Sequence, residues 1–133
     1  MLGLALVAAV VVPVHFQGAQ YDSPGPDGRS PASLNAEWIT IVNDGTAPLS
    51  VADWTVRDAS RVGYTFGKVT IPAKGVIRLH TGKGRNTATD LYWNSGNYIW
   101  NNTGDTATLR DAAGRVVDTC TWKQKANRTW VAC

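Results

Sequence analysis

The chain has 133 residues, of which 44% are hydrophobic and 17% are charged, and its formal net charge is +3 at pH 7. This length indicates one domain rather than several, and the hydrophobic content is sufficient for a real core. The mild positive charge permits weak contact with nucleic acid or an anionic surface but does not demand it.

Residues 1–14, MLGLALVAAVVVPV, form an apolar run that is too short to cross a bilayer as a helix. The run resembles the apolar region of a secretory signal peptide, although the usual positive residues before it are missing. We therefore expect residues 1–12 to be the remnant of a signal peptide. The alternative is a genuine first strand, because residues 10–14 are β-branched apart from Pro13.

Residues 14–21 alternate loosely and predict a strand, whereas residues 22–31 are dense in Pro, Gly, Asp and Ser and predict a loop. Asp22, Asp27 and Ser23 carry oxygen ligands for calcium, but their spacing does not match an EF-hand loop. We favour a solvated loop over a calcium site.

The second expected strand covers residues 34–43, LNAEWITIVN, in which Trp38 and the alternating isoleucines belong to a packed sheet. Glu37 lies inside this strand beside Trp38. A lone carboxylate can be a catalytic acid. We favour the alternative, a hydrogen-bonded or edge-facing structural residue.

Two stretches predict similar β-hairpins, residues 54–66 and residues 103–122, and TVRDAS in the first echoes TLRDAA in the second. In the second hairpin Ala107 and Leu109 alternate with polar residues, which indicates a half-buried strand. Residues 111–114 supply Asp and Gly for the turn. The buried face of the returning strand stays open between two sets, Val116, Asp118, Cys120 and Trp122 on one side or Val117, Thr119 and Thr121 on the other.

Residues 69–80 predict a strand, a Pro-Ala-Lys-Gly turn and a second strand, and a Gly-rich basic loop follows at residues 80–87. That loop does not have the spacing of a phosphate-binding P-loop, so we expect an exposed connection. Its basic residues and those of the preceding hairpin form a candidate basic partner surface, which comprises Lys74, Arg78, Lys83 and Arg85.

Residues 90–100, DLYWNSGNYIW, are the most aromatic segment of the chain. If exposed, Tyr92, Trp93 and Tyr98 provide a stacking platform for sugars or single-stranded bases. Packing of the same rings into the core is the competing interpretation.

Both cysteines, Cys120 and Cys133, lie near the C-terminus. A disulfide between them is expected in an oxidising compartment, where closing the loop would stabilise the fold by roughly 2–4 kcal/mol. The alternative is a pair of unrelated free thiols.

Candidate catalytic groups form no constellation in the sequence. His15 and His80 are isolated from each other, and neither a nucleophile elbow nor an HExxH or paired-carboxylate spacing occurs. No stretch of a dozen residues has helical apolar spacing. We therefore expect no enzyme activity, no cofactor and no metal.

Four segments in order, LNAEWITIVN, WTVRDASRVGYTF, HTGKGRNTATDLYW and WNNTGDTATLRDAAGRVVDTCTW, resemble the lamin tail domain in its secreted bacterial form. The residues that match its motifs are Glu37, Trp38, Trp54, Asp58, Trp100, Asn101, Asn102, Gly104, Asp105, Leu109, Asp111 and Gly114. The resemblance implies an all-β, immunoglobulin-like β-sandwich of about nine strands over residues 13–122. Residues 123–133 are then a C-terminal extension tied by the disulfide.

The resemblance further implies a secreted, non-catalytic and monomeric interaction module that binds a protein or a cell-envelope partner. A weak nucleic-acid-binding accessory module and a carbohydrate or cell-wall binder stay open as alternatives. A sandwich hosts many unrelated functions, so the site has to be argued separately.

Overall fold

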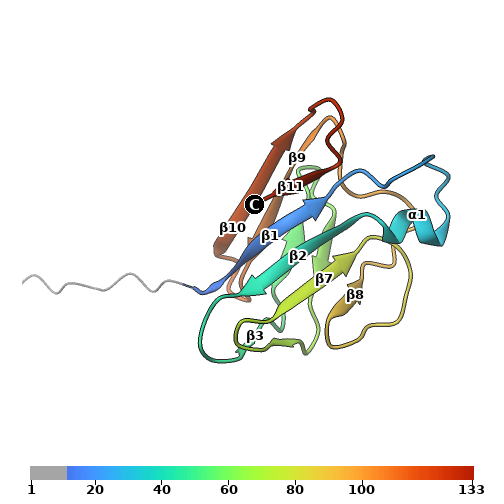
Figure 1. Cartoon of the computed structure of the whole chain (residues 1–133). Coiled ribbons are helices and arrows are strands. Elements are labelled where there is room, and N and C mark those ends of the chain that lie inside the picture. The colour runs from blue at the N-terminus through green and yellow to red at the C-terminus, as the bar shows by residue number, and fades with distance from the viewer. Residues whose placement is uncertain (1–11) are drawn as a thin grey trace, which may run out of the picture.

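The computed structural model describes residues 12–133, which form eleven strands and one short helix (Figure 1). The strands are β1 (Val14–Gln20), β2 (Trp38–Asn43), β3 (Leu49–Ser50), β4 (Thr55–Arg57), β5 (Gly63–Thr65), β6 (Thr70–Ile71), β7 (Val76–His80), β8 (Asp90–Tyr92), β9 (Gly104–Arg110), β10 (Val116–Lys123) and β11 (Trp130–Ala132), and α1 spans Pro31–Asn35. The expected β-sandwich is confirmed. The number of strands is eleven rather than about nine, because several very short strands are present.

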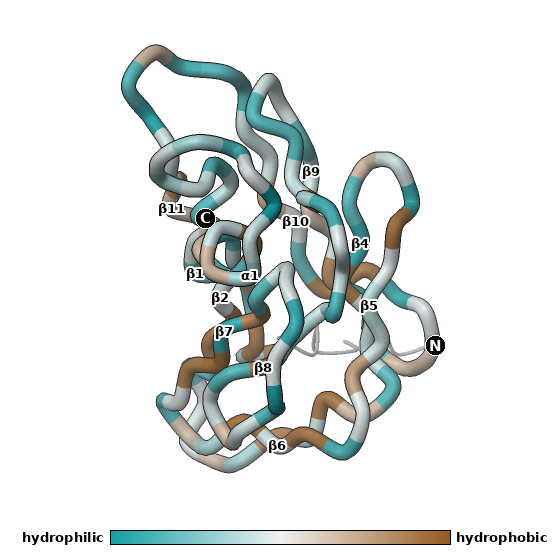
Figure 2. The backbone as a smooth tube through the Cα atoms, turned by 90° about the vertical axis from the view of Figure 1, so that its right-hand side faces the viewer, coloured by the Kyte–Doolittle hydropathy of each residue, from teal (hydrophilic) through white to brown (hydrophobic). Residues whose placement is uncertain are grey.

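Two sheets form the layers of the sandwich, a five-stranded sheet ordered β11-β1-β2-β7-β8 and a four-stranded sheet ordered β10-β9-β4-β5. Figure 2 shows the five-stranded layer on the left, the four-stranded layer on the right, and β6 below them. Strands β3 and β6 form a separate two-stranded ladder. Every pairing is antiparallel except β7 with β8.

The core lies between the two sheets and is built from alternate residues of their strands. Fully burying an aliphatic or aromatic side chain stabilises the fold by about 1.5–3 kcal/mol. The largest contributions come from side chains that are almost completely buried, namely Phe16, Tyr21, Ile39, Ile41, Phe66, Ile71, Ile77, Leu79, Leu91 and Leu109. Trp54, Trp100 and Trp122 complete the core.

The two echoed hairpins together make up the four-stranded sheet, because β4 pairs with β9. Val56 lies opposite Leu109, and the flanking pairs are Thr55 with Arg110 and Arg57 with Thr108. Val56 and Leu109 occupy the same position in the two similar sequences, TVRDAS and TLRDAA. Strands β4 and β9 are therefore related by a local twofold axis that passes between these two residues.

The turns that follow these strands repeat the same hydrogen bonds. The Asp58 carboxylate accepts from the Val62 amide at 2.7 Å, and the Asp111 carboxylate accepts from the Arg115 amide at 2.9 Å. In both turns the aspartate amide also donates back to the carbonyl four residues later. The predicted turn chemistry of Asp111 is therefore present in both hairpins.

Strand β10 buries Cys120 and Trp122, which settles the face that the sequence left open. Ala107 and Leu109 of β9 are buried as expected. A register shift between Val116 and Asp118 leaves Val116 exposed on this strand. Beyond the shift, the Asp118 carboxylate accepts from the Phe16 amide at 2.8 Å and links β10 to β1.

One expectation was wrong: the sequence indicated no helix and a strand from residue 34, but residues Pro31–Asn35 form α1 and β2 begins at Trp38. The Ser30 side chain caps the helix by accepting from the Ser33 amide at 3.1 Å, and Pro31 suits the first helical position. Five residues are too few to produce a helical apolar pattern.

Cys120 and Cys133 form a disulfide, as the sequence predicted. The bond ties the end of the chain to β10, while β11 pairs with β1 and extends the five-stranded sheet. The expected signal remnant at residues 1–12 lies almost wholly outside the described residues. No helix among residues 12–133 is long and apolar enough to cross a membrane.

Candidate functional site

Four segments converge at the end of the sandwich where β2 begins and β7 ends: residues 22–30, α1, residues 81–89 and residues 93–100. Figure 1 shows α1 at this end, which we call the loop end. The Tyr98 hydroxyl lies 2.6 Å from that of Ser33, and the Asn35 side chain donates to the Lys83 carbonyl at 2.8 Å. The Ser95 amide donates to the Thr81 carbonyl at 3.0 Å. These bonds hold α1, residues 81–89 and residues 93–100 together, and the Ser23 hydroxyl, which donates to the Ser33 carbonyl at 2.5 Å, ties residues 22–30 to α1.

Glu37 joins two segments of the loop end, residues 81–89 and residues 93–100, by its side chain. Its side chain is buried, and Oε1 accepts from the Thr81 hydroxyl at 2.7 Å and from the amides of Ile99 and Trp100 at 2.7 and 3.1 Å. Burial raises the pKa of Glu37 to about 7, although the three donors oppose this shift. Glu37 is thus a structural residue that joins β2 to the aromatic segment, as we favoured from the sequence.

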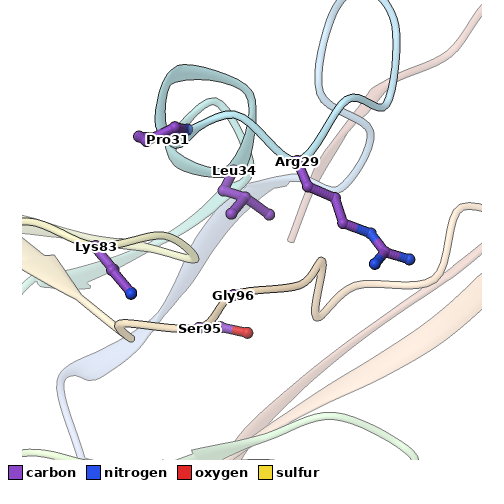
Figure 3. Close-up of a pocket in the computed structure, with 6 residues that line it drawn as sticks. All are labelled: Arg29, Pro31, Leu34, Lys83, Ser95 and Gly96. Carbon is purple, nitrogen blue, oxygen red and sulfur yellow. The ribbon is translucent and has the colours of Figure 1, made fainter.

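A hollow of about 150 Å³ opens at the loop end, lined by Arg29, Pro31, Leu34, Lys83, Ser95 and Gly96 (Figure 3). We call it the loop-end hollow. Within residues 12–133, neither the Arg29 guanidinium nor the Lys83 ammonium forms a salt bridge or a hydrogen bond. Leu34 and Pro31 supply apolar walls. Figure 3 shows the Leu34 side chain directed towards Ser95 and Gly96, with Arg29 and Lys83 on opposite sides of the hollow and the Arg29 side chain extending away from it.

His80 is positioned on the opposite side of β7 from Leu79, and both of its ring nitrogens face oxygen acceptors. Nδ1 lies 2.8 Å from the Asn35 carbonyl and Nε2 lies 2.8 Å from an Asp90 carboxylate oxygen. The bond from His80 lowers the pKa of Asp90 below its ordinary value. Because both ring nitrogens have hydrogen-bonding partners, His80 links α1 to β8 and supports the loop end.

The predicted basic residues do not form one cluster. Lys74 lies in the turn before β7 and donates to the Asp44 carbonyl. Arg78 lies within β7, with its guanidinium 4.0 Å from the centre of the Trp38 ring. Lys83 and Arg85 lie beyond the other end of β7, and only Lys83 lines the loop-end hollow.

The predicted aromatic residues are half-buried, and each has different neighbours. Tyr92 stacks on His80 with ring centres 4.9 Å apart. Trp93 packs against the core, where it contacts Tyr64 and Trp100. Tyr98 holds the loop end through its hydroxyl. The structure therefore does not bring the three rings together on one face.

Asp22 and Asp27, the considered calcium ligands, lie in the loop before α1. Groups of three or more His, Cys, Asp or Glu side chains able to hold a metal are absent from the part of the chain that the structure describes.

Sequence reasoning missed five of the six residues that line the hollow, namely Arg29, Pro31, Leu34, Ser95 and Gly96. They come from separate segments, and only folding brings them together with Lys83. The one available signal was the Ser-Pro pair at residues 30–31, which marks a helix start and would have placed Leu34 on a helix.

The family comparison agrees with this architecture. A sequence model of a protein family, described as the lamin tail domain, matches residues 9–124, which is most of the chain. Domains of this family are immunoglobulin-like sandwiches, as observed here. The search of curated proteins found no matching relative.

Proposed function

Because the chain belongs to the lamin tail domain family, we propose that it is a secreted, non-catalytic interaction module that binds a protein or cell-envelope partner. The family supports an interaction role. The disulfide between Cys120 and Cys133 supports secretion, because such bonds persist in oxidising compartments.

The loop-end hollow is the single observation that carries the binding role. Binding residues concentrate on loops that a rigid scaffold positions, and this loop end is held by Glu37 and by the bonds of Tyr98 and Asn35. Arg29 and Lys83 lie on opposite sides of this hollow (Figure 3), and neither has an acidic partner among residues 12–133. A partner that brings negative charge to this end would supply the acidic groups that these two cations lack.

The test is capture of partners from cell-envelope and culture-supernatant fractions on the immobilised chain. The variant replaces Arg29 and Lys83 by glutamine, which keeps most of each side chain but removes both charges. Its matched control replaces Lys68 and Lys125, two exposed cations outside the hollow, in the same way. We expect a captured component that the control retains and the Arg29→Gln/Lys83→Gln variant loses. Absence of any captured component at several salt concentrations contradicts the module.

Nucleic acid is the main competing outcome. Its binding would weaken steeply with salt, because each phosphate contact releases counterions. A captured component that nuclease removes, and that depends on Lys74 and Arg78 rather than on Arg29, overturns the proposal in favour of a nucleic-acid-binding module.

A further inference from the structure

Five side chains form one row across the outer face of the five-stranded sheet. From β11 through β1, β2 and β7 to β8, the strand register places them in the order Trp130, Gln20, Trp38, His80 and Tyr92. Figure 1 shows β1, β2, β7 and β8 side by side, and neighbouring strands lie about 4.8 Å apart, so the row spans roughly 19 Å. Because side chains alternate along a strand, the row points away from the core, which the adjacent residues fill. Those residues are Ala19, Ile39, Leu79 and Leu91.

Trp130 is the most exposed member of this row, at 43%, whereas the other four are half-buried. A Cβ atom at residue 18 would lie 2.8 Å from the indole, so the ring lies directly over Gly18. The backbone of β1 supports the ring from the sheet side, and the exposed part of the ring faces solvent. Trp130 is therefore a stacking surface for a flat apolar group.

Trp38 lies two strands from Trp130 in the same row, a distance of roughly 10 Å. The Arg78 guanidinium lies over the Trp38 ring, 4.0 Å from its centre. Within residues 12–133 this guanidinium forms neither a salt bridge nor a hydrogen bond. Its N–H groups are therefore positioned by the ring beneath and available to a ligand.

An open trough of about 330 Å³ lies beside the row on the same face. Its lining residues are Gln17, Thr40, Val76, Arg78, Thr89 and Asp90, of which only Val76 is apolar. The Asp90 carboxylate accepts from the Thr89 hydroxyl at 2.8 Å and contacts His80 through its other oxygen, and each oxygen retains capacity for a further donor. The face thus places hydrogen-bonding groups next to a row of rings.

The charges and the polar groups of this trough define the kind of ligand that fits. Arg78 and Asp90 carry opposite charges, so the trough has no net charge and lacks the positive groove that tracks a nucleic-acid backbone. An apolar protein surface would leave the polar groups without partners, which is costly. A sugar chain supplies hydroxyl groups at the edge of each ring and apolar C–H groups on its face.

We propose that the outer face of the five-stranded sheet binds an extended, neutral, β-1,4-linked polysaccharide chain. One sugar ring stacks on Trp130, and the hydroxyl groups of a sugar further along the chain bond to Arg78 and Asp90. Such a chain repeats its ring orientation every two sugars, a length close to the distance between Trp130 and Trp38. This site shares no residue with the loop-end hollow and adds a ligand class to the proposed interaction module.

The experiment is a titration of the ¹⁵N-labelled chain with cellohexaose and chitohexaose, two neutral β-1,4-linked chains, followed by amide chemical shifts. Maltohexaose, an α-1,4-linked chain of the same length that curves, is the matched ligand control. At least one β-linked chain should shift the amides of Thr40, Arg78 and Ala132 and leave those of β9 unchanged. It should bind about tenfold more tightly than maltohexaose, because a curved chain loses one of the two contacts.

Two variants test the residues of this face. Trp130→Leu keeps an apolar side chain over Gly18 but removes the ring, and Arg78→Gln removes the guanidinium; each should weaken binding about tenfold. Arg57→Gln, which changes an exposed arginine on β4 in the other sheet, is the matched control and should bind like the wild type. Because Arg78 is exposed, its variant tests the site even if Trp130→Leu loosens β11.

Equal binding of maltohexaose and the β-linked chains, binding of neither, or unchanged binding in both variants overturns the inference. Tighter binding of a single-stranded oligothymidylate, or capture of a protein that Trp130→Leu abolishes, also overturns it and assigns the face to that partner. Capture that depends on Arg29 and Lys83 is a separate result, so its failure refutes the proposed function alone, and failure of sugar binding refutes this inference alone.

Discussion

Among single residues, Glu37 has the most consequences for the loop end. One carboxylate oxygen of Glu37 accepts three hydrogen bonds from two segments of the loop end, so a buried acid holds these segments in place. Leaving those donors without an acceptor would cost about 1–3 kcal/mol for each buried group, so replacement by alanine should disorder the aromatic segment. Replacement by glutamine keeps an acceptor and removes only the charge.

Glu37 should make the stability of the protein depend on pH. Its pKa rises from 4.5 to about 7 on folding, so the native state binds the proton more tightly than the unfolded state. The stabilising contribution is therefore present below pH 4.5 and is lost as pH rises towards 7. Between pH 5 and pH 8 the wild type should lose roughly 2–3 kcal/mol more unfolding free energy than Glu37→Gln.

Urea unfolding of both proteins at the two pH values measures this difference. His15 acts in the same direction, because its hydrogen bond with Asp44 raises the pKa of the imidazole and the gain is lost as pH rises. Since His15 is present in both proteins, its contribution cancels. Parallel pH profiles for the wild type and Glu37→Gln would show that Glu37 is not the cause.

At the level of elements, the repeated hairpin explains how the four-stranded sheet is organised. A short motif of one strand and an aspartate turn occurs twice, and the two copies pair about Val56 and Leu109. Val56 and Leu109 lie opposite each other on the two paired strands, and both are completely buried.

Leu109→Ala should destabilise the protein by roughly 2–5 kcal/mol, because it opens a cavity at the centre of the four-stranded sheet. Thr108→Ala is the matched control, one residue earlier on the same strand and facing the other way. Its cost should stay within about 1 kcal/mol. Thermal unfolding compares the stabilities of the two variants. An equal loss of stability in both would mean that any change in this strand destabilises the protein, whether or not the side chain is buried.

Gly18 should be required for β11 to dock. A Cβ atom at residue 18 would lie 2.8 Å from the Trp130 ring and 3.0 Å from the Val131 carbonyl, so the incoming strand has no room for it. Gly18→Ala should therefore speed hydrogen exchange of the β11 amides while the β9 amides stay protected. Gly28→Ala, where the new atom meets open space, is the control; unchanged exchange in Gly18→Ala would contradict the steric argument.

For the whole molecule, the sequence predicted the layers well and the loop end poorly. Alternating residues such as Ala107 and Leu109 reveal a buried strand face directly, because the strand period of two is local. That Arg29 and Lys83 line one hollow, in contrast, depends on how loops distant in the sequence pack together. The orientations of Tyr92 and Trp93 also depend on the pairing of β8 with β7 in the five-stranded sheet. The local sequence pattern carries no information about that pairing.

The disulfide should decide whether the C-terminal segment stays on the sandwich. Cys120 and Cys133 are separated by 13 positions, and in the chain-entropy model a loop of this length stabilises the native state by about 3 kcal/mol. Reductant should lower the urea midpoint of the wild type and leave Cys120→Ala/Cys133→Ala unchanged. Thiol titration of the native protein, purified without reductant, should find almost no free thiol. Two titratable thiols in the native protein, or a urea midpoint that reductant does not change, would contradict the disulfide. Either result would also remove the main support for secretion.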